Sequence, residues 1–417
     1  MTEPVGRGKT QCNNVSETRP RETPVSPKLE TNCPAAAMVA AQVIVFARIP
    51  DLGADRAMGR SAQDTDGMVS TLNYPSPLVG IIANPASGRD IRRVVARASV
   101  FQTTEKVSMV LRVAAALHAL GVGTVLLMPD RGGIAAAIHR ELQGAHDSVQ
   151  LPRMATLDMP ITETAADSAL ATRLMVEAGA AAIVVLGGDG THRVVAGSCG
   201  EVPLATLSTG TNNTFPELRE ATLVGLATGL VASGRVAVAA ACRRNKCLWV
   251  ETARRRELAL VDVAVVRRRH LGARALWQAE DLAELYVSFA EPDAIGLSSI
   301  AGLLAPVSRS DRYGLQVRMD PSAHGHLLAP IAPGLLARVP VAGHHRLAPE
   351  QPVAVALAAG TLALDGEREI EFVAADRPRV RLSLHGPLTI DVPTTLRLAA
   401  ERGLLRTQHS IPEEEQT

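Results

Sequence analysis

The feature that most constrains this sequence is an apolar segment that ends on a glycine-rich turn. Residues 181–186 are small or branched apolar residues, as in a strand buried inside a parallel sheet. A strand, a glycine-rich turn and a helix start together form an anion-binding cradle, because glycine lets backbone N–H groups approach a phosphate and the helix dipole favours negative charge. The turn consists of Gly187, Gly188, Asp189, Gly190 and Thr191, and an amphipathic segment, 192–199, predicts the helix.

A carboxylate inside that turn is unexpected in a phosphate site, since Asp189 would repel a bare phosphate. It becomes useful if it holds Mg²⁺ or takes a proton from an attacking hydroxyl group. For a generic Gly-Asp-Gly, a helix-capping aspartate in a tight turn is the favoured interpretation. The complete GGDGT motif directly after a buried strand is more specific and predicts a phosphate site.

Length and composition set the bounds on everything else. The 417 residues are enough for two domains, and the formal net charge of +1 gives no electrostatic case for nucleic-acid or membrane binding. The apolar run 35–49 contains Gln42 and Arg48 and is too short to span a membrane. Five cysteines without a paired CxxC pattern, and no ordinary secretion signal, predict reduced thiols and a cytoplasmic protein.

The first half of the chain shows alternating strand and helix patterns after a polar leader, residues 1–74, which we expect to be disordered. Alternation at this spacing predicts a doubly wound parallel sheet, a Rossmann-like nucleotide-binding domain over residues 75–233. Thr104 and Thr164 are the expected N-caps of two of its helices. The predicted strands are 78–83, 122–128, 154–157, 181–186 and 203–207, and the predicted helices are 105–120, 134–142, 164–179 and 216–232.

The second half changes to short alternating segments separated by Pro, Gly and His, which predicts a β-rich acceptor-binding domain over residues 234–393. A final helix and an acidic tail are expected in residues 394–417. The predicted strands are 236–241, 248–251, 258–266, 314–319, 335–341, 353–364, 369–373, 380–384 and 388–392.

Polar, glycine-containing loops follow three of the predicted parallel strands. Ligands bind beyond the carboxyl ends of such strands, so we expect the three loops to converge on one rim and surround a phosphate. The GGDGT turn is the second loop. The first holds Asn84, Pro85, Ser87 and Gly88, and the third holds Gly210, Thr211, Asn212 and Asn213.

Four motifs occur in order along the chain: NPASG at 84–88, GGDGT at 187–191, STGTNN at 208–213 and LDGE at 364–367. Together they resemble the ATP-dependent NAD kinase and diacylglycerol kinase superfamily, and most of all its acetoin catabolism protein X group. The resemblance implies a Rossmann-like domain followed by a β-sandwich, with ATP and Mg²⁺ as cofactors and NAD as the acceptor. It also implies that Asp189 contacts or deprotonates the ribose 2′-hydroxyl.

The resemblance gives Asp365 and Glu367 the roles of candidate base and metal ligands. Two carboxylates on either side of a glycine in a bent turn could share Mg²⁺ or a proton. A plain Asp-Gly hairpin turn with a solvated glutamate is the alternative interpretation.

Departures from the family motifs bear on the acceptor. Lipid kinases continue GGDGT with Asn-Glu, where this chain has His192 and Arg193, and they favour an acid at Asn213. Both changes count against a lipid kinase. The acceptor half also differs from NAD kinases, and the residues that match its pattern in part are Asp262, Ser298 and Ser299.

Three functions therefore stay open: an NAD kinase-like phosphotransferase, which is favoured; a nucleotide-binding regulatory protein with weak chemistry; and a lipid kinase. The expected partners are small-molecule nucleotides. The sequence leaves the donor, ATP or polyphosphate, and self-association undecided.

Overall fold

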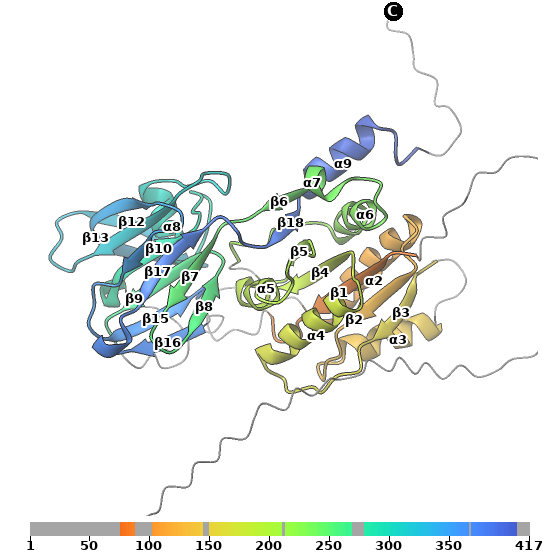
Figure 1. Ribbon diagram of the computed structural model, residues 1–417, viewed down its shortest axis with the longest axis horizontal. Coiled ribbons are helices and arrows are strands. Elements are labelled where there is room, and N and C mark those ends of the chain that lie inside the picture. The colour runs from red at the N-terminus through yellow and green to blue at the C-terminus, as the bar shows by residue number, and fades with distance from the viewer. Residues whose placement is uncertain are drawn as a thin grey trace, which may run out of the picture. The chain divides into compact units, whose positions relative to one another are not determined.

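The first element that the structure describes is a strand of a parallel sheet. The computed structural model describes residues 76–87, 102–144, 150–210, 213–268, 279–366 and 368–406 (Figure 1). The predicted leader and the acidic tail beyond residue 406 lie outside this part of the chain. Within it, no helix combines the length and apolar character needed to cross a membrane.

The N-terminal sheet has seven strands in the order β3-β2-β1-β4-β5-β18-β6. Its first five strands pair in parallel, which confirms the predicted doubly wound sheet. The strand order reverses between β1 and β4, so the loops after these two strands lie side by side at the site where such sheets bind ligands. The five strands are β1 (Leu78–Ala83), β2 (Thr124–Leu127), β3 (Arg153–Thr156), β4 (Ala182–Gly187) and β5 (Leu204–Ser208).

Helices cover both faces of this sheet because side chains alternate along its buried strands. Val184 and Leu186 of β4 pack with α2, α3, α6 and α9, whereas Ile183 and Val185 pack with α4 and α5 (Figure 1). The helices are α2 (Thr103–Ala119), α3 (Ile134–Gly144), α4 (Ala165–Glu177), α5 (Asp189–Ala196), α6 (Ala221–Ala232), α7 (Val238–Ala241) and α9 (Val392–Glu401).

Several helix starts differ from the predictions. Helix α6 begins at Ala221 rather than at residue 216, and α9 begins at Val392, before the predicted range 394–417. Gln102, not Thr104, precedes α2, and its side chain makes no capping hydrogen bond. Helix α5 begins at Asp189 rather than at residue 192, so the last three residues of the GGDGT motif form its first turn. The Thr164 cap is confirmed, because its hydroxyl oxygen accepts the Ala166 N–H at 3.2 Å.

The C-terminal half contains two antiparallel sheets, with orders β12-β13-β11-β10-β9-β15-β16 and β14-β17-β7-β8. They share a core that includes Val250 of β7, Val265 of β9 and Leu362 of β15. The strands are β7 (Cys247–Glu251), β8 (Arg256–Ala259), β9 (Asp262–Val266), β10 (Leu282–Val287), β11 (Gly314–Met319), β12 (His326–Ala332), β13 (Leu335–Leu347), β14 (Pro352–Ala354), β15 (Gly360–Leu364), β16 (Arg368–Phe372) and β17 (Arg379–Ser383), with helix α8 (Ser298–Leu304) and the 3₁₀ turns η2 (Ala279–Asp281) and η3 (Ala374–Asp376).

Sequence patterns missed β6, β10 and β12 and assigned two other segments incorrectly. Segment 236–241 was predicted as a strand but contains the short helix α7. Strand β18 (Leu388–Ile390), expected in the β-rich domain, instead pairs in parallel with β5 and antiparallel with β6 (Cys242–Arg244). The reason is packing, since Ile390 and Val392 belong to the core of the N-terminal sheet.

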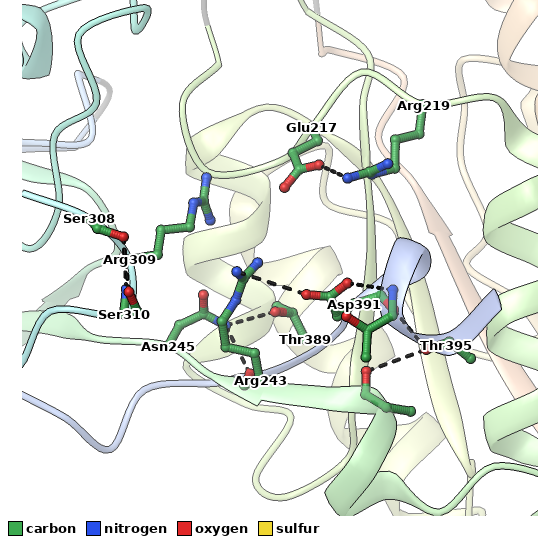
Figure 2. A network of polar contacts seen from close by, with 12 residues as sticks. Glu217, Arg219, Arg243, Asn245, Ser308, Arg309, Ser310, Thr389, Asp391 and Thr395 are labelled. Carbon is green, nitrogen blue, oxygen red and sulfur yellow. Dashed lines mark hydrogen bonds and ion pairs between the residues drawn. The ribbon is translucent and has the colours of Figure 1, made fainter. Parts of the chain in front are cut away.

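The chain passes twice between the N-terminal and C-terminal sheets, through residues 244–247 and 383–388, and the two passages are bonded together. Asn245 and Pro387 are joined by two hydrogen bonds of 3.0 Å, from the Asn245 backbone N–H and its side-chain amide to the Pro387 carbonyl. The same amide donates to the Thr389 hydroxyl at 2.8 Å (Figure 2). We call this pair of segments the crossing.

Candidate functional site

The three predicted loops meet at one edge of the N-terminal sheet. The Asn84 side-chain amide donates to the Thr191 hydroxyl at 2.8 Å, which joins the first loop to the second. The hydroxyl groups of Ser87 and Thr209 lie 2.7 Å apart and join the first loop to the third. Finally, the Thr209 N–H donates to the Gly187 carbonyl at 3.2 Å. Each loop is therefore bonded to the other two, and we call this assembly the rim.

Asp189 lies at the first position of α5 and is nearly buried, with 9% of its surface exposed. Its carboxylate accepts the backbone N–H groups of Thr214 and Phe215, at 3.0 and 2.8 Å. The carboxylate thus connects the second loop to the chain that leaves the third. It also lies where the dipole of α5 favours negative charge.

Glycine is required at Gly187 by close packing. A Cβ atom there would lie 2.6 Å from the Thr191 Cβ, so a side chain would push Thr191 away from Asn84. Gly188 precedes α5 with extended backbone, and Gly190 lies in its first turn. The N–H groups of a first helical turn have no acceptor within the helix, which makes them donors to an anion.

The third loop closes on itself. The Asn213 amide donates to the Ser208 hydroxyl at 2.8 Å, and a Cβ on Gly210 would lie 2.9 Å from the same amide. The predicted phosphate-binding residues Gly88, Thr211 and Asn212 lie outside the described residues. The described side chains of the rim mainly hold the loops together, which leaves backbone N–H groups as the candidate phosphate donors.

Lys106 is a rim residue that the sequence interpretation missed. It lies on α2 with 1% of its surface exposed, and its ammonium group donates to the carbonyls of Asn84 and Ser87, both at 2.8 Å, and more weakly to Pro85 at 3.4 Å. Lys106 therefore holds the backbone of the first loop against α2. The available signal was a lysine on the apolar face of a helix, next to Val107.

His192, which stands where lipid kinases have asparagine, is fully buried on α5. Its Nδ1–H donates to the Gly188 carbonyl at 2.8 Å, and its ring packs against Phe215. Burial lowers the pKa of His192 to about 4, so the ring is neutral at pH 7. These contacts fit a residue that positions the start of α5.

Arg193, the next residue, connects α5 to the C-terminal half. Its Nε lies 3.7 Å from an oxygen of Asp365, whose side chain is wholly buried. The same carboxylate accepts backbone N–H groups from Leu260 at 3.0 Å, Val261 at 2.8 Å and Asp262 at 3.2 Å. Burial raises the pKa of Asp365, while Arg193 and the three N–H groups act in the opposite direction.

These contacts favour a structural role for Asp365. It lies in the turn between β15 and β16 with φ +48°, followed by Gly366 at φ +68°, as in the hairpin-turn interpretation. Its predicted partner Glu367 lies outside the described residues. Within the described ranges, no group of three or more His, Cys, Asp or Glu side chains is placed to hold a metal ion. The predicted base and metal roles of the pair stay predictions.

Two residues of the C-terminal half contact the segment that follows the third loop. The Ser298 hydroxyl lies 3.4 Å from that of Thr214. Arg309, which the sequence interpretation missed, donates to the carbonyls of Thr214 and Phe215 and lies over the ring of Phe289 at 4.0 Å. Thr214 and Phe215 therefore donate their N–H groups to Asp189 and accept hydrogen bonds from Arg309 at their carbonyl groups.

The other two predicted acceptor residues are buried near β9 and α8. Asp262 is the first residue of β9. Its backbone N–H donates to the Asp365 carboxylate, and its carbonyl accepts the Asp365 N–H at 3.0 Å. Ser299 donates to the Gly296 carbonyl at 2.6 Å, a contact that stabilises the start of α8. Of the three, Ser298 contacts the segment next to Asp189 most directly.

Comparison with known proteins agrees with this division of the chain. Residues 79–236 match the ATP-NAD kinase N-terminal domain, and residues 246–385 match the acetoin catabolism protein X C-terminal domain. Acetoin catabolism protein X from Cupriavidus necator (strain H16) is 49% identical over 342 residues, which cover 80% of this chain and 95% of that protein.

The parallel sheet, its rim and the antiparallel β-rich half define a two-domain protein of the NAD kinase-like class. Within that class, the chain belongs to the acetoin catabolism protein X family.

Proposed function

We propose that this protein is an ATP- and Mg²⁺-dependent phosphotransferase that acts on the ribose 2′-hydroxyl of NAD or a related acceptor. One observation carries the proposal. Asp189 lies at the start of α5, where three loops are bonded into one rim at the switch point of a parallel sheet. That position combines a phosphate cradle with a carboxylate able to contact a hydroxyl group.

Phosphoryl transfer depends mainly on positioning of the two reactants and on neutralisation of the charge on the transferred group. The acceptor oxygen forms a bond to the γ-phosphorus as the bond from that phosphorus to the β–γ bridging oxygen breaks, and ADP leaves. Asp189 would accept or orient the proton of the hydroxyl group. Backbone N–H groups at the start of α5 would hold phosphate oxygens.

The rim fits a nucleotide phosphate better than a protein-bound metal. Gly187 has no room for a side chain, and the described residues include no cluster of metal ligands. Mg²⁺ is commonly held by one or two carboxylates and the substrate's phosphate oxygens. Asp189 is the rim carboxylate that could take part, and the metal would neutralise charge on the transferred group.

The decisive assay measures NADP formation by the purified protein with ATP, Mg²⁺ and NAD. We expect turnover in the wild type and a loss of about 10²–10⁴-fold in Asp189→Asn, the range that general base catalysis contributes. Glu177→Gln is the matched control, because Glu177 is exposed at the end of α4 and precedes β4. Folded wild-type protein that binds ATP without forming NADP contradicts the proposal.

A second candidate is a nucleotide-binding regulatory protein with weak chemistry. The enclosed carboxylate of Asp365 and the amide at Asn213 favour it, since neither side chain provides the reactive acid that the related motifs carry. Calorimetry with ATP and NAD(P) separates the two. Binding without ADP release under any acceptor supports regulation, and ADP release supports transfer.

A lipid kinase is the third candidate, and the same ADP-release assay with diacylglycerol micelles tests it. We expect no stimulation, because the chain has His192 and Arg193 in place of Asn-Glu. His192 bonds to the Gly188 carbonyl at the start of α5, and Arg193 lies near Asp365. A cytoplasmic location fits the free thiols of Cys199, Cys242 and Cys247 in the described part of the chain.

A further inference from the structure

A pocket of about 370 Å³ lies beside the crossing, apart from the three loops of the rim. Its walls come from residues 243–246, the loop 309–312 and residues 384–385. Six of the lining side chains are basic: Arg243, Arg244, Lys246, Arg309, Arg312 and His385. The pocket therefore gathers basic residues that are far apart in sequence.

Acidic groups offset only part of this positive charge. Asp311, the acidic residue of the lining, accepts the Ser308 N–H at 2.8 Å. Arg244 forms an ion pair with Glu201, and an Arg243 nitrogen lies 3.9 Å from Asp391. Within the described residues, the Nε of Arg243 is buried and has no hydrogen-bond partner.

Two arginines of the lining repel each other. Burial lowers the pKa of Arg309 and the positive charge of Arg243 acts in the same direction, whereas the carboxylates of Glu291, Glu217 and Asp189 act in the opposite direction (Figure 2). Lys246 is also buried, which lowers its pKa to about 8, and its ammonium group donates to the carbonyls of Ser308 and Tyr313. An anion between these groups would relieve the repulsion.

We propose that this pocket is a binding site for a small phosphate-bearing anion, separate from the rim. Four arginines, one with a buried unpaired Nε, supply the planar donor groups that suit phosphate oxygens. A volume of about 370 Å³ leaves room for a phosphate group. The observation that carries the assignment is the excess of arginine over carboxylate in a preformed pocket.

Binding of an anion in the pocket would affect Asp189 through Thr214 and Phe215. Arg309 holds the carbonyls of Thr214 and Phe215, and Asp189 holds the N–H groups of these same residues. An anion that draws the Arg309 guanidinium into the pocket weakens its bonds to the two carbonyls. The segment that supports Asp189 then loosens, so the pocket's ligand acts on the rim.

The test titrates the full-length protein with inorganic pyrophosphate by calorimetry at constant ionic strength. Arg312→Gln and Arg243→Gln are each expected to weaken binding about tenfold, and Arg243→Lys less. Arg312 is exposed, so its substitution leaves folding intact. The control is Arg338→Gln, an exposed arginine on β13, which should change the affinity less than twofold.

Asn84→Ala separates the pocket from the rim, because Asn84 joins the rim loops and does not line the pocket. The inference predicts an unchanged pyrophosphate affinity in this variant. Loss of binding in Asn84→Ala together with unchanged binding in Arg243→Gln and Arg312→Gln overturns it, as does the absence of binding to the wild type. No turnover is measured, so the result does not depend on the proposed kinase activity.

A second readout tests the link to Asp189. Pyrophosphate should raise amide hydrogen exchange at residues 214–215 at least threefold in the wild type, and by less in the more weakly binding Arg312→Gln at the same concentration. Unchanged exchange in saturated wild-type protein contradicts the link.

Discussion

The rim and the β15–β16 hairpin each bury an aspartate whose oxygens accept backbone N–H groups, but the two sites differ in what surrounds the carboxylate. Asp189 lies at a helix start and joins two loops at the switch point of the sheet. Asp365 faces three N–H groups of one segment and the guanidinium of Arg193. A motif carboxylate can therefore stabilise the fold when N–H donors occupy its lone pairs and a nearby cation matches its charge.

The largest expected effect sharpens this comparison by removing the Asp365 carboxylate. Asp365→Ala leaves three buried N–H groups and Arg193 without their acceptor, so we expect a loss of about 3–5 kcal/mol in the free energy of unfolding. Urea denaturation measures it. Asp320→Ala, at an exposed turn, is the control. If the stability of Asp365→Ala stays within 1 kcal/mol of wild type while turnover vanishes, Asp365 is catalytic after all.

The next effect is a pH dependence that comes from His192. Its pKa falls from 6.5 in the unfolded chain to about 4 in the folded protein, so the unfolded state binds the proton more readily between these values. Stability is fully present above pH 6.5 and is lost as the pH falls toward 4, by about 3 kcal/mol in total.

Urea denaturation between pH 7 and pH 4.5 checks this prediction. His192→Gln should flatten the decline relative to the wild type by about 1.4 kcal/mol per pH unit near pH 5. His344→Gln, which changes an exposed histidine on β13, should leave the slope as it is. Identical slopes in wild type and His192→Gln would show that His192 does not titrate in this way.

Gly187→Ala tests the packing of the rim. The added Cβ meets Thr191 at 2.6 Å, so we expect about 1–3 kcal/mol of destabilisation and weaker ATP binding. Gly144→Ala is a matched control, since a Cβ at the end of α3 meets nothing within 4 Å. Equal stability of the two variants would mean that the second loop is looser than its contacts imply.

The smallest effect concerns the acceptor side. Ser298→Ala removes a hydroxyl 3.4 Å from that of Thr214, and we expect the KM for NAD to rise about threefold with stability within 1 kcal/mol of wild type. Ser299→Ala, which removes the hydrogen bond to the Gly296 carbonyl just before α8, should lower stability and leave the KM unchanged. A KM change in Ser299→Ala alone would reverse these assignments.

Sequence patterns predicted the parallel sheet well because its central strands β1, β4 and β5 are buried apolar runs that end at polar or glycine-containing turns. They predicted a strand at β18 but placed it in the wrong sheet, because a three-residue strand carries no sign of which sheet it joins. They placed three loops on one rim from topology alone. Lys106, Arg309 and the enclosure of Asp365 depend on contacts between distant segments, which local patterns do not encode.

The most direct test of the account measures amide hydrogen exchange on adding a non-hydrolysable ATP analogue with Mg²⁺. The account predicts that residues 84–87, 187–191 and 209–214 slow together, while residues 260–262, which hold Asp365, keep their rates. Slowing at 260–262 with no change at the three rim segments would contradict it.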